Sequence, residues 1–250
     1  IPDDNLLNRI TDLAEDLRNG IPGTERVARA RRGFQTVAVA TLVVSTAVTA
    51  WLWPAVLPAR LAVQLIGLGY NYRVVPTHRG LSRFKEIYFL KNFMSAVLFV
   101  FTGFVYPLLA APRAMSWHAV ALLAAFFVCF ELSYEILYDF RDLDGDRAEG
   151  IPTYPVVHGA RGARWIIDGL LAASAALLVG GLIGGVIGVR EALMIAAPVA
   201  QIAFYRPRLR RGLTPRDCIL LTHVGTIQLV VYLMGNAAWL ALGLPANIML

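Results

Sequence analysis

Residues 115–150 read MSWHAVALLAAFFVCFELSYEILYDFRDLDGDRAEG, an apolar run that ends in a cluster of acidic side chains. The segment 115–138 is long enough to cross a bilayer, for which a helix needs about 20 mostly apolar residues. Glu131 and Glu135 fall inside this run, where an ionised side chain costs roughly 2.5–3.5 kcal/mol on insertion scales. The stretch therefore predicts a membrane helix that carries a functional acidic site.

The composition of the whole chain is that of a membrane protein. Of its 250 residues, 57% are apolar and 16% are charged, whereas soluble domains have about 25% charged residues. Two cysteines, Cys129 and Cys218, lie in apolar runs and form no disulfide or zinc pattern. We predict an all-α polytopic transmembrane helical bundle with seven spans in this chain, the further six at about 34–53, 59–72, 88–109, 163–187, 190–205 and 216–242.

The basic residues alternate between the two ends of these predicted helices. Of the 23 Lys and Arg residues, 20 lie in the segment 9–33 and in every second loop after it, and Arg60, Arg113 and Arg190 lie at the opposite ends. The positive-inside rule places the basic loops in the cytoplasm. This distribution follows a membrane topology and not a nucleic-acid surface, so the predicted partner is the lipid bilayer and not nucleic acid.

The acidic residues of the opening stretch fall on one side of a helix. At 100° per residue, five of them lie within a stripe of about 80° if the helix continues through residue 146, with Asp144 on the opposite side. The five are Glu131, Glu135, Asp139, Asp142 and Asp146.

A second acidic group lies in residues 5–20, NLLNRITDLAEDLRNG, where Asn8, Asp12 and Asp16 are spaced four residues apart. On a helix they share one face, and the predicted topology puts them at the same membrane surface as the first group. Oxygen ligands of this kind suit Mg²⁺, which usually takes one or two carboxylates together with water and substrate phosphate. Two facing acidic rows therefore predict a site that binds Mg²⁺ and a diphosphate and makes the diphosphate a leaving group.

Residues 73–92, RVVPTHRGLSRFKEIYFLKN, supply the expected cations Arg83, Lys85 and Lys91. Both lysines of the chain lie here, and a lysine acts on phosphate as a compact point charge. Tyr134 and Tyr138 interleave with the acidic stripe, where their rings are expected to face a cation. With Arg141 they complete the predicted substrate-binding residues.

Three segments resemble the UbiA superfamily of intramembrane prenyltransferases. NRITDLAED (8–16) resembles the first Asp-rich motif, NxxxDxxxD. YDFRDLDGDRAEGIPTYPVVHG (138–159) resembles the second motif, and RFKEIYFLKN (83–92) resembles the lysine loop between the fourth and fifth helices. The family has nine transmembrane helices, and the resemblance begins at the end of the second. It implies a single UbiA-like prenyltransferase domain over 1–250 that lacks its first two helices.

The resemblance also implies a mechanism. Mg²⁺ would hold an isoprenyl diphosphate, Lys85 with Arg83 or Lys91 would steady the departing diphosphate, and an aromatic or lipid acceptor would attack the allylic cation. The catalytic residues would be Lys85 and the five aspartates of the two motifs. The implied metal ligands are Asn8, Asp12, Asp16, Asp139, Asp142 and Asp146.

Three other functions use some of the same features. A UbiA-type terpene cyclase would employ the same diphosphate site without an external acceptor. A cation-coupled transporter would also carry intramembrane carboxylates, but it is expected to show internal repeats and acidic groups near mid-bilayer. No repeat is evident in the sequence, and the acidic rows lie mostly near one surface beside basic loops. A non-catalytic lipid-binding scaffold would tolerate replacement of Asp139 and Asp142 by Asn.

Overall fold

The chain is described from a computed structural model, which covers residues 9–18, 20–77, 80–110 and 116–244. It divides into two compact units. The first unit combines Ile1–Arg113 with Asp142–Gly159, and the second combines Ala114–Arg141 with Ala160–Leu250.

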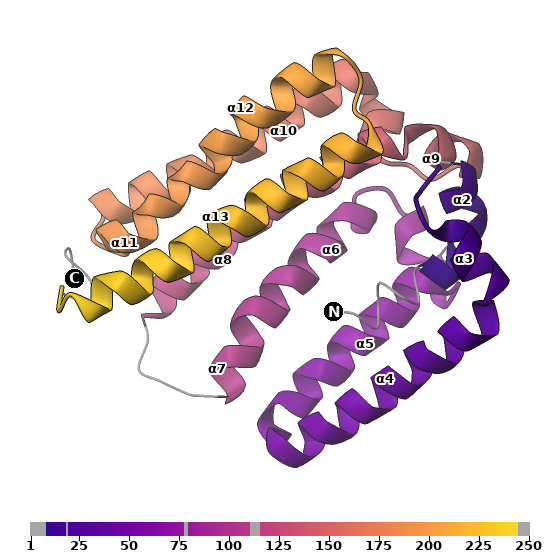
Figure 1. The fold of residues 1–250 in the computed structure, drawn as a ribbon, viewed down its shortest axis with the longest axis horizontal. Helices are drawn as coiled ribbons and strands as arrows, with labels where there is room; N and C mark the ends of the chain where they lie inside the picture. The colour runs from indigo at the N-terminus through magenta and orange to yellow at the C-terminus, as the bar shows by residue number, and fades with distance from the viewer. Residues whose placement is uncertain (1–8, 19, 78–79, 111–115, 245–250) are drawn as a thin grey trace. The chain divides into compact units, whose positions relative to one another are not determined.

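The first unit is built from helices and one small β-ribbon. Its helices include α3 and α4, which follow each other closely, and α5, which follows the turn after α4 (Figure 1). In chain order its elements are α2 (Leu13–Arg18), α3 (Thr24–Arg29), α4 (Arg31–Leu52), η1 (Pro54–Val56), α5 (Leu57–Asn71), β1 (Val75–Thr77), β2 (Gly80–Ser82), η2 (Phe84–Glu86), α6 (Leu90–Val100), η3 (Phe101–Val105), α7 (Tyr106–Ala110) and α9 (Leu143–Glu149).

Helices α4 and α5 form a hairpin whose turn is set by proline. Pro54 opens η1 and Pro58 lies in the first turn of α5, where the missing N–H of proline has no intrahelical partner to lose. The Trp53 N–H donates to the Thr49 carbonyl at 2.9 Å and ends α4. Gln64 of α5 donates to the hydroxyl of Thr46 of α4 at 2.7 Å, so a polar contact joins the two helices along their length.

A two-stranded antiparallel ribbon follows α5 and modifies the all-α prediction. Strands β1 and β2 pair in the register Val75↔Ser82, Pro76↔Leu81 and Thr77↔Gly80. The Thr77 hydroxyl donates to the Gly80 carbonyl at 2.8 Å. The run Val74–Val75 is too short to show an alternating pattern, so the sequence predicts a loop here and not strands.

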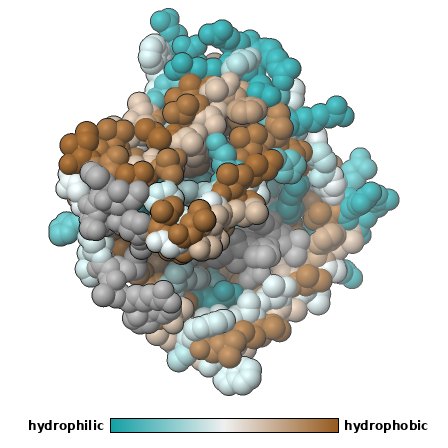
Figure 2. Space-filling model, turned by 60° about the vertical axis from the view of Figure 1, so that its left-hand side comes forward, coloured by the Kyte–Doolittle hydropathy of each residue, from teal (hydrophilic) through white to brown (hydrophobic). Residues whose placement is uncertain are grey.

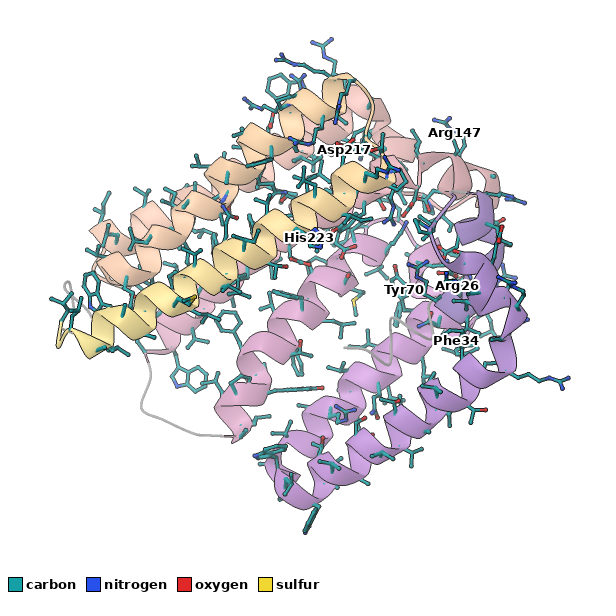
Figure 3. All side chains as sticks on the ribbon, in the orientation of Figure 1. Arg26, Phe34, Tyr70, Arg147, Asp217 and His223 are labelled. Atoms are coloured by element: carbon teal, nitrogen blue, oxygen red, sulfur yellow. The ribbon has the colours of Figure 1, made fainter. Side chains whose placement is uncertain are left out.

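The second unit contains the remaining long helices. They are α8 (Trp117–Arg141), α10 (Tyr154–Ile183, which enters this unit at Ala160), α11 (Val189–Ala192), η4 (Leu193–Ile195), α12 (Ala196–Arg210) and α13 (Pro215–Ala241). Figure 1 shows α12 and α13 side by side, and residues of the two helices are in contact. Asp217, labelled in Figure 3 in the first turn of α13, accepts a hydrogen bond from Arg211 at 2.6 Å and fixes the turn between them.

Phe126, Leu178 and Ile187 form a buried apolar cluster in the second unit. Gly181 lies beside it, and a Cβ atom at this glycine would come within 2.6 Å of Leu122. A small residue at such a point lets helix backbones approach closely, which is the usual way in which membrane helices pack.

Five helical segments are long and apolar enough to cross a membrane: Arg31–Leu52, Leu90–Ala110, Trp117–Arg141, Tyr154–Ile183 and Pro215–Ala241. Helices α5 and α12 occupy the places of the other two predicted spans but have 15 residues each. Apolar side chains cover much of the face shown in Figure 2, as expected for helices whose outer surface meets lipid. The polytopic all-α architecture is therefore confirmed, and a count of seven spans stays a prediction.

Candidate active site

The two acidic segments adopt the same local structure in the first unit. Residues 12–22, DLAEDLRNGIP, and 142–152, DLDGDRAEGIP, share the pattern D-L-x-x-D-x-x-x-G-I-P. The N–H of the second aspartate donates to the carbonyl of the first in both, at 2.8 Å for Asp16 to Asp12 and 2.9 Å for Asp146 to Asp142. The shared residues are few and lie 130 positions apart, so the likeness of the two motifs is not evident as a repeat in the sequence.

Each segment ends in the same helix-stopping turn. Gly20 and Gly150 have φ of 63° and 68°, the left-handed conformation that glycine adopts readily. The N–H of the following isoleucine then donates to the second aspartate's carbonyl, at 3.0 Å for Ile21 and 2.8 Å for Ile151. This is a Schellman motif. It ends each acidic helix one turn beyond the second aspartate.

Lys85 and Asp12 form a buried ion pair. The Lys85 ammonium donates to the Asp12 Oδ1 at 2.6 Å, and the two residues are 2% and 8% exposed. The Arg83 guanidinium lies 3.6 Å from the same oxygen. Both cations therefore lie at a carboxylate of the first acidic motif. Their predicted contact with a diphosphate stays a prediction.

The η2 turn that carries Lys85 is held from two sides. Gly69 of α5 makes room for the Phe84 ring, since a Cβ atom at Gly69 would lie 2.5 Å from Phe84 Cε2. Glu86 accepts hydrogen bonds from the Arg83 backbone N–H at 3.1 Å and from the Arg73 guanidinium at 3.1 Å. Burial opposes ionisation of Glu86, but these hydrogen bonds and the charge of Arg83 outweigh it and lower the pKa of Glu86.

Lys91 pairs with the second motif. Its ammonium donates to both carboxylate oxygens of Asp146 at 3.0 Å, and Asp146 is fully buried. Between the two lysines, Phe89 has φ of 73°, a conformation that costs a non-glycine residue of order 1–3 kcal/mol. This turn lets two lysines six positions apart reach two different aspartates.

Helices α2 and α9 pack against each other in the first unit. Arg18 of α2 donates to Glu149 of α9 at 2.6 Å, and Arg9 pairs with Asp16 at 3.3 Å. The described aspartates of the two motifs therefore belong to two helices that adjoin each other: Asp12, Asp16, Asp142 and Asp146. That they form one shared site stays a prediction. Asn8 lies outside the described residues.

The helix is not continuous through residue 146. The prediction that five carboxylates lie on one stripe of a single helix is therefore wrong. Helix α8 ends at Arg141 and α9 begins at Leu143. Asp142 stands between them with φ of −95° and ψ of 6°, at the N-cap position that aspartate favours. Asp139 is in the last turn of α8 in the second unit, so its role as a ligand stays a prediction. Asp144 is exposed, and its place outside the site stays a prediction.

Tyr134 and Tyr138 make contacts within the second unit. The Tyr134 hydroxyl donates to the Leu221 carbonyl at 3.4 Å, and the Tyr138 hydroxyl bonds to that of Thr222. The Arg141 guanidinium lies 5.2 Å from the centre of the Tyr138 ring. These contacts bind the two tyrosines to α13. Their predicted part in substrate binding, like that of Arg141, stays a prediction.

The structure adds residues that the sequence analysis did not single out. The buried Asn71 amide oxygen accepts from Thr11 at 3.0 Å and so ties the end of α5 to the first motif. Tyr88 is hydrogen-bonded to His158, and both rings lie next to Tyr154. The sequence offered one signal for Asn71, because an asparagine at the end of an apolar helix needs hydrogen-bond partners if it is buried.

The chemistry of the donor set fits a hard divalent cation. The four aspartates of α2, α9 and their N-terminal ends offer only carboxylate oxygens, which Mg²⁺ prefers. Within the described ranges no three His, Cys, Asp or Glu side chains are gathered closely enough to hold a metal. The positive charges of Lys85 and Lys91 stand at Asp12 and Asp146, so these two carboxylates already have cationic partners.

These features define the class of the protein as a polytopic helical membrane protein with two aspartate motifs beside a loop that carries two lysines. The sequence profile of the UbiA prenyltransferase family matches residues 82–221, more than half of the chain, and the chain belongs to this family. It is therefore an integral membrane protein, and the resemblance seen in its motifs is confirmed.

Two curated relatives are similar to parts of the chain. A digeranylgeranylglyceryl phosphate synthase of Natronomonas pharaonis is 42% identical over 53 residues, which is 21% of this chain and 19% of the relative. The enzyme of the same name from Methanothermobacter thermautotrophicus is 34% identical over 87 residues, 35% of this chain and 26% of the relative. The chain thus matches about a fifth to a quarter of the length of these relatives. No solved structure matches it.

Proposed function

We propose that the protein is a Mg²⁺-dependent intramembrane prenyltransferase, which ionises an isoprenyl diphosphate and transfers the prenyl group to an aromatic or lipid acceptor. The observation that carries the proposal is the pair of buried lysine–aspartate contacts, Lys85 with Asp12 and Lys91 with Asp146, on two adjoining acidic helix ends. Membership of the UbiA family supports the same activity.

The lysine–aspartate pairs suit a site in which the lysines have an anionic partner both before and after the substrate binds. Without substrate, each lysine balances a buried carboxylate, since an unpaired buried charge is strongly unfavourable. Asp12, Asp16, Asp142 and Asp146 would hold Mg²⁺, with Asn8 and Asp139 as further predicted ligands. When bound, Mg²⁺ supplies positive charge that makes the diphosphate a better leaving group. Lys85, Lys91 and Arg83 then have phosphate oxygens as their partners.

The reaction breaks the bond between the allylic carbon and the diphosphate oxygen, and the electron pair leaves with the diphosphate. Cations fixed beside the leaving oxygens stabilise the charge that develops there. A nucleophilic atom of the acceptor then bonds to the allylic carbon and loses its proton. The basic loops and the acidic motifs would face the cytoplasm, where the positive-inside rule places them.

The acceptor is proposed to be a lipid that carries a glyceryl phosphate head group. Both relatives are named for the synthesis of a glyceryl phosphate with two geranylgeranyl groups. A lipid acceptor of this kind can reach the site from the bilayer, in which the prenyl chain of the donor is also dissolved. An aromatic acceptor stays the alternative within the same proposal.

The test measures diphosphate release from geranylgeranyl diphosphate by the purified protein, with Mg²⁺ or with EDTA. It is run without acceptor, with geranylgeranylglyceryl phosphate, and with 4-hydroxybenzoate. We expect Mg²⁺-dependent release only with an acceptor, and a prenylated acceptor by mass spectrometry. Asp142→Asn should reduce the rate roughly 100-fold or more, whereas Asp144→Asn, an exposed control on the same helix, should keep it.

The other functions predict different results in this assay. A cyclic hydrocarbon formed without acceptor would identify a terpene cyclase. No release under any condition from a folded protein would contradict the proposal and favour a transporter or a lipid-binding scaffold. Wild-type rates for Asp142→Asn would contradict the assignment of the site.

A further inference from the structure

One end of the second unit is strongly basic, where α10 enters the unit and where the turn between α12 and α13 lies. Residues 160–217 contain eight arginines and three acidic residues. Arg190 lies at the other end of these helices and is paired with Glu191 at 2.8 Å. The other seven arginines belong to the basic end: Arg161, Arg164, Arg206, Arg208, Arg210, Arg211 and Arg216.

The two carboxylates at the basic end already have cationic partners. Asp168 of α10 is paired with Arg206 of α12 at 3.1 Å. Asp217, in the first turn of α13, is paired with Arg211 at 2.6 Å and lies 3.4 Å from Arg208. Among the residues that the structure describes, no carboxylate pairs with the remaining four arginines, which are Arg161, Arg164, Arg210 and Arg216.

The pair of Asp168 and Arg206 shows where the free arginines lie along the helices. Helices α10 and α12 are in contact here and run in opposite directions, since only residues 184–195 separate them (Figure 1). Arg164 lies four residues before Asp168, and Arg210 lies four residues after Arg206. Both are therefore about 6 Å beyond the ion pair along the helix axes, at the same end of the two helices.

Arg164 is the half-buried member of the four free arginines. Its Nε–H is buried and has no hydrogen-bond acceptor among the described residues, although buried donors are usually satisfied. Its guanidinium lies 5.8 Å from the centre of the Trp165 ring. Trp165 is 60% exposed and begins the mostly apolar run 165–183, a position typical of tryptophan at the membrane–water interface. The guanidinium therefore lies at the depth of lipid head groups.

We propose that the basic end of the second unit binds an anionic phospholipid. The lipid phosphate would be bound by the Arg164 guanidinium, whose N–H donors form a planar fork that matches a phosphate. The charges of Arg161, Arg210 and Arg216 add attraction for the head group. Clusters of basic residues beside a membrane helix recognise anionic lipids in this way.

A lipid is favoured over free phosphate because its acyl chains remain in the bilayer beside α10 and hold the head group at the depth of Trp165. None of the four arginines belongs to the aspartate motifs or to the lysine loop. Lipid binding is therefore independent of prenyl transfer, and it can be measured on its own.

The test measures lipid binding by the delipidated protein in a neutral detergent. Phosphatidylglycerol, phosphatidylcholine and inorganic phosphate are titrated separately, and binding is followed by native mass spectrometry and by thermal unfolding. We expect saturable binding of phosphatidylglycerol with a raised unfolding temperature, and little effect of the other two. Arg164→Gln should weaken phosphatidylglycerol binding about tenfold, as expected for the loss of a hydrogen bond to a charged group.

Matched variants separate the phosphate contact from the surrounding charge. Arg164→Lys keeps the charge without the planar fork and should retain part of the affinity. The triple variant Arg161→Gln, Arg210→Gln and Arg216→Gln changes three exposed residues and keeps Arg164. It should bind more weakly and with less dependence on salt, because salt screens exposed charges. Arg32→Gln is the control, since it removes an exposed arginine from α4 in the first unit; it should bind lipid as the wild type does.

Four results would overturn the proposal. Equal binding of phosphatidylglycerol by the wild type and Arg164→Gln would exclude Arg164 as the phosphate contact. An equal loss of binding in Arg32→Gln would show a response to net charge and not to this surface. Equal stabilisation by inorganic phosphate would show that the ligand is a free anion. Wild-type affinity and salt dependence in the triple variant would exclude the surrounding arginines, and this result is decisive even if Arg164→Gln fails to fold.

Discussion

Lys85 is a buried ammonium group that pairs with the buried carboxylate of Asp12 at 2.6 Å. Removal of Lys85 takes the nearer of two described cations from the buried Asp12 carboxylate and leaves Arg83 at 3.6 Å, and breaking a buried ion pair costs up to about 3–5 kcal/mol. We expect Lys85→Met to lower the thermal unfolding temperature of the detergent-solubilised protein strongly. The double variant Lys85→Met with Asp12→Asn should recover much of this loss of stability, because it removes the negative charge of Asp12. It should not recover prenyl transfer.

The exposed pair of Arg18 and Glu149 supplies the control for that experiment. Its side chains are 53% and 35% exposed, and such surface pairs contribute about 0–1 kcal/mol. Arg18→Gln should therefore change the unfolding temperature little. If Lys85→Met were as stable as Arg18→Gln, Lys85 and Asp12 would not form a buried pair.

Gly69 is predicted to position Lys85 through Phe84. A Cβ atom at Gly69 would lie 2.5 Å from Phe84 Cε2, so Gly69→Ala must displace the ring and with it the η2 turn. We expect a lower kcat, although alanine favours a helix more than glycine does. Phe84→Leu in the Gly69→Ala background should restore part of the rate by making room for the methyl group.

Gly33→Ala is the control for Gly69→Ala, because an added Cβ on this α4 glycine meets open space. It should keep the wild-type kcat. A rate loss in Gly69→Ala that Phe84→Leu fails to relieve would show that the contact between Gly69 and Phe84 does not set the position of Lys85.

The residue types of the site were predictable from the sequence, but their pairing was not. The helical spacing of the carboxylates predicts Asp12 and Asp146 as site residues, and the loop that contains both lysines predicts Lys85 and Lys91. Both lysines were expected to act on phosphate. Which aspartate each lysine meets depends on the φ of Phe89 and on the contact between α2 and α9, and neither leaves a pattern in the sequence.

At the level of elements, the two Schellman turns hold the acidic helix ends in place. Gly20 and Gly150 have positive φ, and an added Cβ at either meets open space, so alanine there is opposed by backbone strain alone. We expect Gly20→Ala and Gly150→Ala each to destabilise the protein by about 1–2 kcal/mol, measured by unfolding in detergent. Gly169→Ala in α10, also in open space but without positive φ, should be neutral or stabilising.

The long apolar helices could be predicted from the sequence because proline and glycine bound their apolar runs. The predicted 34–53 and 216–242 correspond to Arg31–Leu52 and Pro215–Ala241. The break at Asp142 could not be predicted in this way. The acidic residues have helical spacing in the sequence whether or not one residue between them leaves the helix. The start of α10 at Tyr154 was missed because 154–162 contains Pro155, two glycines and the polar residues His158 and Arg161, and because Gly159 interrupts its helical dihedral angles.

At the scale of the whole chain, the membrane topology depends on whether α5 and α12 cross the bilayer. Helical structure is continuous from Pro54 to Asn71 and from Val189 to Arg210. At 1.5 Å per residue these segments measure about 27 and 33 Å, close to the 30 Å of a hydrocarbon core. The alternation of basic loops requires that both segments cross, since each lies between a weakly and a strongly basic end.

We therefore predict that Ala55 and Ile183 face one side of the membrane and Leu81 and Arg210 face the other. All four side chains are exposed, so each can be replaced by cysteine after Cys129 and Cys218 have been replaced by alanine. A membrane-impermeant maleimide should label Ala55→Cys and Ile183→Cys in intact cells, and Leu81→Cys and Arg210→Cys only after permeabilisation. Labelling of Ala55→Cys and Leu81→Cys from the same side would show that α5 does not span, and the same result for Ile183→Cys and Arg210→Cys would exclude α12. Either outcome would place some basic loops outside the cytoplasm, and the proposed cytoplasmic diphosphate site would then lose the topological argument on which its location rests.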